Sequence, residues 1–392
     1  MRLSNIELIR DTQTSRIQCF VGGVNVFIEV ENKYADNLVY ETADSFILAA
    51  MLPALMAGED IECDTVSDDL YYHSSTILYL LSKVFRKPCI KIVPKHIVHV
   101  DFHPAAIGTG FSGGIDSFAT FLSHTNNSCP EAYKITHLTL FNIGSYGNDY
   151  NLTLEKFNKD VQRAQPFAEK IGLPLITVNS NIGNLFTHKE IRHYSLRSTI
   201  CLSVGILALS KLFRTYLISS SGTIDDMKLS RYDQYFYENS LTQLLSSHNT
   251  NIIVSEADLD RVEKTKIVAE NDLPKDFLYV CAADIYNEKF NTNFNKDTAP
   301  NCSKCIKCVR TMMTLEILGY RDKFSSRFDF PKYEKEYKRH LLDIATKKGY
   351  DHFSREIYEL MQQKGIRIPW TILCRGWIKG QIKQIKYKIK NR

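Results

Sequence analysis

The first hundred residues alternate short β-like stretches with apolar helical stretches. RIQCFVGGVNVFIEV at 16–30 is rich in β-branched and aromatic residues, which is typical of strands. SFILAAMLPALMAG at 45–58 and STILYLLSKVF at 75–85 predict helices, and CIKIVPK at 89–95 predicts a further strand. We therefore expect an N-terminal α+β domain over residues 1–104.

From residue 105 to residue 280 the pattern becomes one of strands that alternate with helices. Strands are predicted at THLTLFNI, LPLITVNS, TYLISSS and NIIVSEA, and helices at SFATFLSHT, LEKFNKDVQRAQPFAEKIG and STICLSVGILALSKLF. This alternation favours an α/β fold, a Rossmann-like parallel sheet with helices on both faces. Ligands bind such sheets at the carboxyl ends of the strands.

The last part of the chain divides into a cysteine-rich element over 281–320 and a helical region over 321–392. The final helical segment has an apolar stripe bordered by lysines, formed by Ile378, Ile382, Ile385 and Ile389 with Lys379, Lys383, Lys386 and Lys390. Such a tail is typical of an element that docks on an acidic partner, a membrane surface or RNA. The alternative is a helix packed on its own domain with a lysine-rich outer face.

Composition and charge indicate an ordinary globular protein with a basic tail. The chain has 392 residues, of which 44% are hydrophobic and 24% are charged, as in ordinary globular proteins. The net charge of +5 comes from the tail, because residues 375–392 contain seven basic residues and no acidic one. With no signal-peptide pattern at the start, we expect a cytoplasmic protein whose ten cysteines are reduced thiols and metal ligands.

The motif FSGGIDS at 111–117 lies between a strand-like stretch and a helical one. Gly113 and Gly114 allow the backbone to turn sharply and to approach a ligand closely. Successive amides and the amino end of a helix attract phosphate, and Ser112 and Ser117 add hydroxyl donors. Asp116 would hold a Mg²⁺ that bridges phosphates, or would tie the loop through backbone bonds. The alternative is a serine-rich turn with an aspartate as helix cap.

The string Ser-Gly-Gly-x-Asp-Ser resembles the PP-loop of the ATP pyrophosphatase superfamily, which has a HUP-type fold and splits ATP into AMP and pyrophosphate. The resemblance covers residues 105–280. It implies that the five motif residues surround the β- and γ-phosphates of ATP together with Mg²⁺. It also implies that the adenine lies near Phe141, Asn142 and Ile143.

Three cysteines at C-x2-C-x2-C spacing, Cys302, Cys305 and Cys308, follow a fourth at Cys281. Four thiolates from a strand end and a tight knuckle match a tetrahedral structural Zn²⁺ site. An iron–sulfur cluster and free buried cysteines are the alternatives.

Three basic residues, Lys304, Lys307 and Arg310, interleave with the cysteines. Solvated charges that offset the thiolates are the ordinary interpretation of all three. For Arg310, contact with the triphosphate or with an anionic substrate is an equal alternative.

A PP-loop followed by four cysteines resembles the deazaguanine nitrile synthases of the queuosine pathway (QueC-like enzymes). Three further segments are similar to theirs, namely RHYSLRS at 192–198, SSGTIDDMKLSRYDQ at 220–234 and RVEKTKIVAE at 261–270. This similarity makes Arg197, Asp225, Asp226 and Lys266 candidate catalytic residues. Each also has an ordinary interpretation as a helix-start arginine, a solvated carboxylate or a surface lysine. The first hundred residues, the basic tail and the long spacing after Cys281 depart from that family.

The resemblance implies an ATP-dependent ligase that forms a C–N bond. An unidentified small-molecule acceptor would be adenylated on a carboxylate or amide oxygen, and ammonia or an amine would then displace AMP. Two alternatives stay open: a PP-loop sulfurtransferase that acts on RNA, and a non-catalytic nucleotide-binding module. We also expect a homo-oligomer.

Overall fold

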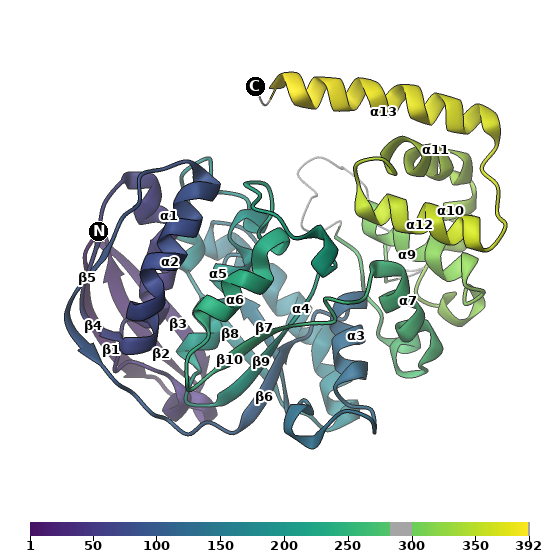
Figure 1. Cartoon of the computed structure of the whole chain (residues 1–392). Coiled ribbons are helices and arrows are strands. Elements are labelled where there is room, and N and C mark those ends of the chain that lie inside the picture. Colours follow the sequence, from purple (N-terminus) through teal and green to yellow (C-terminus); the bar gives the residue numbers. More distant parts are fainter. Residues whose placement is uncertain (283–299, 391–392) are drawn as a thin grey trace. The chain divides into compact units, whose positions relative to one another are not determined.

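The computed structural model describes residues 1–282 and 300–390, with side chains described up to residue 383. The chain forms two compact units, which Figure 1 shows in colours that follow the sequence. The sheet unit comprises residues 1–112 and 123–258, and the helical unit comprises residues 113–122 and 259–392. The short segment from 113 to 122 therefore groups with residues that follow it by more than a hundred positions.

An eight-stranded sheet forms the centre of the sheet unit. Its strands run in the order β1-β2-β3-β8-β7-β6-β9-β10. Their bounds are β1 Leu3–Arg10, β2 Thr14–Val21, β3 Val24–Glu31, β6 Ala106–Gly110, β7 His137–Asn142, β8 Leu175–Ser180, β9 Phe213–Ser219 and β10 Asn251–Ser255. The five neighbouring strands β8, β7, β6, β9 and β10 are parallel to one another. Strands β1, β2 and β3 pair antiparallel with one another, and β3 pairs antiparallel with β8. The predicted α/β class with a mostly parallel sheet is confirmed.

The N-terminal hundred residues contribute three strands to this same sheet. Strands β2 and β3 form a hairpin whose turn, Gly22 and Gly23, has positive φ at both residues. Strand β3 then pairs with β8 through Ile28 and Ser180. The boundary expected at residue 104 therefore falls inside one sheet. Residues 1–104 also form a second, two-stranded parallel sheet from β4 (Ile61–Ser67) and β5 (Ile92–Val98).

Five α-helices belong to the sheet unit: α1 (Asp44–Ala57), α2 (Asp68–Phe85), α4 (Tyr150–Ile171), α5 (Ser198–Ala208) and α6 (Glu238–Leu245). Helices α1 and α5 are apolar on nearly all sides and pack against each other, so most of their side chains are buried. Within the described ranges, no helix combines the length and the apolar character needed to cross a membrane.

The parallel strands have a switch point beside β6. From β6 the chain proceeds outward to β7 and β8, and it then returns to place β9 and β10 on the other side of β6. Ligands of open α/β sheets bind at such reversals of strand order, beyond the carboxyl ends of the strands. The residues that follow the carboxyl end of β6 in the chain are those of the FSGGIDS motif.

The helical unit holds α3 (Ile115–Ser123, grouped with this unit up to Leu122), α7 (Arg261–Glu270), α9 (Ile306–Ile317), α10 (Phe330–Glu334), α11 (Tyr337–Lys347), α12 (His352–Gln363) and α13 (Trp370–Lys390). Helix α7 begins with a capping box between Asp260 and Glu263, and Asp351 caps α12. These caps fix where both helices start, and both starts lie in the region described next.

Candidate functional site

The glycine turn of the motif has the predicted strand–turn–helix context. Gly113 has a φ of +74°, a left-handed conformation that favours glycine. Its carbonyl accepts a hydrogen bond of 2.8 Å from the amide of Tyr279, which joins the turn to the chain just before the cysteine cluster. Helix α3 begins at Ile115, and the Ser117 hydroxyl donates to the carbonyl of Gly114 at 3.1 Å. The turn is therefore followed at once by the positive end of a helix, which favours an anion.

Asp116 lies in the first turn of α3 and forms an ion pair with Arg261, the first residue of α7. The guanidinium donates to Oδ2 of Asp116. The other carboxylate oxygen, Oδ1, is buried and has no hydrogen-bond partner among the described residues. A buried carboxylate oxygen without a donor is unfavourable, so this atom is suited to meet a cation or a donor that the protein itself does not supply.

Arg261 was not predicted as a site residue. It lies within the segment RVEKTKIVAE, but the position that sequence similarity singled out there was Lys266. Lys266 is 59% exposed, and its ammonium lies 3.9 Å from Glu270 on the same helix. Lys264 is buried. Since residues two positions apart on a helix point to nearly opposite sides, Lys264 and not Lys266 faces the interior of the helical unit.

The basic residues among the cysteines have different surroundings. Arg310 donates two hydrogen bonds to the carboxylate of Asp351, at 2.9 and 2.7 Å, and its guanidinium carbon lies 4.5 Å from the ring centre of Phe353. Desolvation lowers the pKa of Lys307, and Arg261 adds to this effect, while Asp116 and Cys305 oppose it. The Lys307 side chain is exposed, and the charges of Arg261 and Asp116 both act on its pKa. Lys304 is exposed.

Arg197, in the sheet unit, is fully buried at the start of α5. Its guanidinium donates to the carbonyls of Ile191 at 2.7 Å, Arg192 at 2.8 Å and Gly144 at 3.1 Å, and to the side-chain oxygen of Asn148 at 2.7 Å. Desolvation lowers the pKa of Arg197. These bonds hold the loop after β7 against the segment before α5, so the side chain braces two loops.

The other predicted residues of the sheet unit differ in exposure. Phe141, Asn142 and Ile143 are buried at the end of β7, where the Asn142 amide donates to Asn179 at 2.8 Å. Asp225 is exposed and Asp226 is partly exposed, in a short 3-10 turn. Ser112 is exposed as well, at the last position of its segment of the sheet unit.

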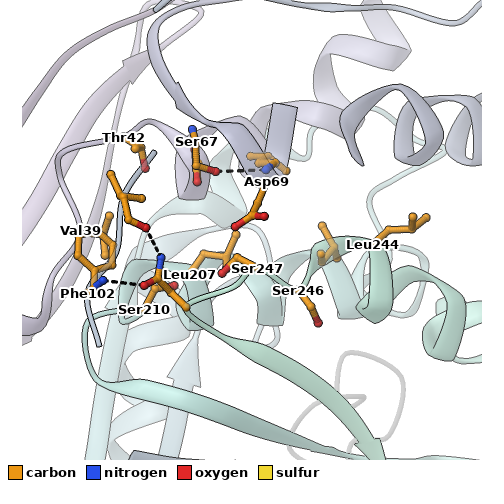
Figure 2. A pocket seen from close by; sticks show the side chains of 15 residues that line it. Val39, Thr42, Ser67, Asp69, Phe102, Leu207, Ser210, Leu244, Ser246 and Ser247 are labelled. Atoms are coloured by element: carbon orange, nitrogen blue, oxygen red, sulfur yellow. Dashed lines mark hydrogen bonds between the residues drawn. The ribbon is translucent and has the colours of Figure 1, made fainter. Parts of the chain in front are cut away.

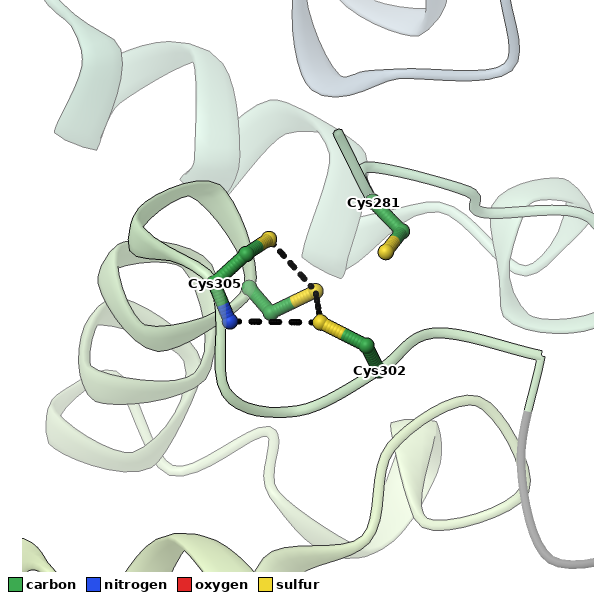
Figure 3. Close-up of side chains that lie close together, drawn as sticks. Cys281, Cys302 and Cys305 are labelled. Atoms are coloured by element: carbon green, nitrogen blue, oxygen red, sulfur yellow. Dashed lines mark hydrogen bonds between the residues drawn. The ribbon is translucent and has the colours of Figure 1, made fainter. Parts of the chain in front are cut away.

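The four cysteines lie together in the helical unit, as predicted. All four sulfur atoms lie within 4.8 Å of one another. Sγ of Cys308 is 3.8 Å from that of Cys302 and 3.4 Å from that of Cys305. Figure 3 shows the side chains of Cys281, Cys302 and Cys305 close together. A tetrahedral Zn²⁺ with Zn–S bonds of about 2.3 Å separates its sulfur ligands by about 3.8 Å. The donor set and spacing are therefore compatible with zinc.

Local hydrogen bonds place these cysteines. The side chain of buried Asn301 accepts from the amides of Val280 and Cys281 at 2.8 and 3.1 Å, and it donates to the carbonyl of Leu278 at 3.1 Å. This single side chain thereby fixes the upstream segment beside the knuckle, across a separation of about twenty positions.

Backbone amides also stabilise negative charge on the cluster. Within the knuckle, the amides of Lys304 and Cys305 point at Sγ of Cys302, at 3.5 and 3.2 Å. A hydrogen bond from Cys281 lowers the pKa of Cys302 to about 7 and lowers that of Cys305 too, whereas the pKa of Cys308 is raised. Thiolates are the form that binds a metal ion. The two knuckle amides thus stabilise the thiolate form of Cys302, in which it would bind a metal ion.

No match was found for this chain among family models, curated proteins or solved structures.

A second group of titratable residues, which sequence analysis did not single out, lies in the sheet unit. Nδ1 of His99 is 2.8 Å from Asp68, and Nδ1 of His248 is 2.5 Å from Asp69. The two imidazole rings are stacked, with 4.6 Å between centres and 13° between planes. Because the lone pair of an imidazole nitrogen lies in the ring plane, one ion does not meet both of these parallel rings. In this arrangement each histidine is hydrogen-bonded to an aspartate of the protein itself.

Beside this group is a small cavity, shown in Figure 2. Asp44, Asp69 and Asn249 contribute polar groups to its lining, and Asn249 bonds the backbone of Val100 and Phe102. Its volume of about 20 Å³ has room for a water molecule or an ion, but not for a nucleotide.

Proposed function

We propose that this protein is an ATP-dependent enzyme that forms AMP and pyrophosphate, and that it adenylates an oxygen of a small-molecule acceptor before a nitrogen nucleophile attacks. The observation that carries this proposal is the glycine turn after β6. Gly113 has the left-handed conformation that such a turn needs, α3 starts two residues later, and β6 lies at the switch point of the parallel strands. Together these features support binding of a polyphosphate at residues 112–117.

The ion pair between Asp116 and Arg261 gives this turn charged groups of both signs. Arg261 would bind a non-bridging phosphate oxygen, as guanidinium groups do where charge develops during phosphoryl chemistry. Oδ1 of Asp116 is the buried atom that would hold Mg²⁺. When bound, that ion would neutralise charge on the β- and γ-phosphates. Lys307, coupled to the same pair, would add positive charge beside the leaving pyrophosphate.

The proposed reaction has two steps. An acceptor carboxylate or amide oxygen forms a bond to the α-phosphorus of ATP, and the bond from that phosphorus to the bridging oxygen breaks, which releases pyrophosphate. Ammonia or an amine then attacks the activated carbon, a C–N bond forms, and AMP leaves with the oxygen while a proton passes to solvent. The protein contributes by positioning the reactants and by stabilising charge, which are the main devices of phosphoryl-transfer enzymes.

In this proposal the four cysteines hold a structural Zn²⁺ and take no part in the chemistry. All four are close enough to bind one ion, and a structural site uses all four ligand positions. The hydrogen bond between Gly113 and Tyr279, two residues before Cys281, is the route by which the folded cluster would keep the turn in shape.

Product analysis tests the proposal directly. The full chain, loaded with zinc, is incubated with ATP, Mg²⁺ and a panel of carboxylic acids with ammonium, and the nucleotide products are separated by chromatography. We expect AMP and pyrophosphate, and exchange of labelled pyrophosphate into ATP when the right acid is present. Formation of ADP and phosphate would refute the assignment. ATP binding without any turnover across the panel would favour the non-catalytic alternative, and sulfur incorporated into RNA would favour the sulfurtransferase.

A further inference from the structure

The C-terminal helix α13 packs on α11 through glycines. A Cβ atom added to Gly376 would lie 2.5 Å from Cβ of Ala345, and one added to Gly380 would lie 2.8 Å from the carbonyl oxygen of Thr346. Both glycines are buried, one turn apart on the helix. The backbones of the two helices therefore approach closely, and the glycine side of α13 is the side that packs on α11, the helix beside it in Figure 1.

The opposite side of α13 is apolar and exposed. Trp370 and Trp377 are 77% and 66% exposed, and Ile378 and Ile382 are 52% and 47% exposed. Ile378 lies about half a helical turn away from Gly376 and therefore belongs to the outer side, whereas Ile382 is partly exposed at the edge of a cavity that it lines together with Leu342, Asp343 and Thr346 of α11. Ile378 is therefore not part of the surface by which this helix packs on its unit. Ile385 and Ile389 lie beyond the described side chains.

Helix α13 is also strongly basic. Between residues 370 and 390 it contains six basic residues and no acidic one. Arg375, Lys379 and Lys383 are exposed, and the two lysines stand on the α11 side of the helix, where Asp343 lines the same cavity. We name the exposed residues Trp370, Trp377, Ile378 and Ile382, with these three basic residues, the α13 face.

We propose that the α13 face binds the surface of an anionic lipid bilayer, with the helix lying in the plane of the interface. Aliphatic side chains enter the boundary between headgroups and acyl chains, tryptophans prefer the headgroup level, and lysines and arginines attract anionic headgroups. The α13 face holds all three kinds of residue, and each of them is exposed. The glycine packing on α11 keeps the helix seated in its unit while this face is presented.

Two other occupants fit the same face less well. An RNA strand would pair with the basic residues and stack on the exposed tryptophans, but it would leave the aliphatic Ile378 and Ile382 without an apolar partner. A second copy of the chain would bring another set of basic residues against the first, and like charges oppose that contact. An anionic membrane offers a partner to both kinds of residue, because its acyl chains accept the apolar side chains and its headgroups attract the basic ones. The proposal does not depend on the proposed enzymatic function.

Vesicle sedimentation with the full chain tests the inference. The protein is mixed with vesicles of phosphatidylcholine alone, or with vesicles that contain about 30 % phosphatidylserine. We expect sedimentation with the anionic vesicles, weakened at high salt, and a blue shift of the tryptophan fluorescence on binding. The double variant W377S/I378S, which removes apolar area, and the double variant K379Q/K383Q, which removes charge, are each expected to reduce partitioning at least tenfold.

Matched controls come from the sheet unit. Y72S/Y79S removes two exposed aromatic residues, and K95Q/K159Q removes two exposed lysines. Both controls are expected to bind vesicles as the parent does, and circular dichroism shows whether every variant is folded. Equal binding by all variants, or no binding to anionic vesicles, would overturn the proposal. Tight binding of an oligouridylate without vesicle binding would assign the face to RNA, and a dimer abolished by W377S/I378S without vesicle binding would assign it to self-association.

Discussion

Asp116 and Arg261, which are 145 positions apart in the sequence, form an ion pair that joins the first turn of α3 to the first residue of α7. The amide of Arg261 is itself held by Glu356 at 3.1 Å. One oxygen of Asp116 is thus committed to a cation, while the other is buried with no donor among the described residues. The pair explains how a carboxylate is accommodated in a turn otherwise suited to anions, because the arginine neutralises its charge.

We expect D116N to reduce AMP formation at least about 100-fold, because the amide replaces the charge that would hold Mg²⁺ and position Arg261. Since the pair is partly exposed, we expect only about 1 kcal/mol of lost stability. The measurements are product chromatography and urea unfolding. D36N is the matched control, because Asp36 pairs with Arg10 at an exposed position in the sheet unit. A D116N enzyme as active as the parent would contradict the proposed function.

We expect G113A to lower stability by about 1 kcal/mol, because the left-handed φ of +74° strains any residue with a Cβ. We also expect a large loss of ATP binding, since relief of that strain moves the turn. G172A is the control, because Gly172 has a φ of +70° at the end of α4 and an added Cβ there meets no atom within 4 Å. The two variants should lose similar stability, and only G113A should lose ATP affinity in calorimetry. Equal ATP affinity in both would show that the turn is not the binding site.

We expect the purified protein to contain about one zinc ion per chain and C305S to contain almost none, because three thiolates alone bind zinc much more weakly. The melting temperature of the helical unit should fall by about 10 °C or more in C305S, or when the parent is treated with a strong chelator. Elemental analysis and calorimetry provide the readouts. C129S, which removes a cysteine outside the cluster, should change neither. Stoichiometric iron with sulfide would instead identify an iron–sulfur cluster.

We expect R197K to destabilise the sheet unit by about 2–4 kcal/mol, because a lysine cannot reach the four acceptors that the buried guanidinium binds. Proteolysis should then begin in the loops near Gly144 and Ile191. If Arg197 acts only by bracing these loops, AMP formation at a temperature where R197K is folded should stay within about tenfold of the parent. A loss of kcat with unchanged stability would make it a catalytic residue.

Asp233 predicts a pH dependence of stability. Desolvation raises the pKa of this carboxyl to about 6, above the ordinary value of 3.8, even though the Tyr235 amide donates to it. A raised carboxyl pKa means that the folded state favours the protonated form of Asp233. The stability that this protonated carboxyl contributes is fully present below pH 3.8 and is lost as the pH rises through about 6. The loss amounts to at most about 3 kcal/mol. D233N should therefore be more stable than the parent at pH 8 and equally stable near pH 4. Parallel stability profiles of both proteins in urea unfolding would refute this.

Much of the local structure could be predicted from the sequence. Apolar periodicity located the strands from β7 to β10 and the helices α3, α4 and α5, although not α6, because burial of one face imposes a period of two or of 3.6 residues. The glycine pair predicted the turn, since only glycine adopts the conformation of residue 113 without strain. The spacing of Cys302, Cys305 and Cys308 predicted a shared ligand site, because a knuckle of that length brings three thiols to one point.

The amino-acid pattern was therefore sufficient to predict most strands and helices and the ligand sets formed by residues close together in the chain. Contacts between distant segments determine that Arg261 is the partner of Asp116, that Lys264 and not Lys266 points inward, and that β1–β3 extend the main sheet. The contacts between helices also decided that α13 packs on its unit by Gly376 and Gly380, because the inward side of a helix depends on the surface it meets, here Ala345 and Thr346 of α11. The physical reason is common to all four: a pattern along the chain specifies which residues are buried or charged, whereas the partner of each is chosen by contacts between segments far apart in the sequence.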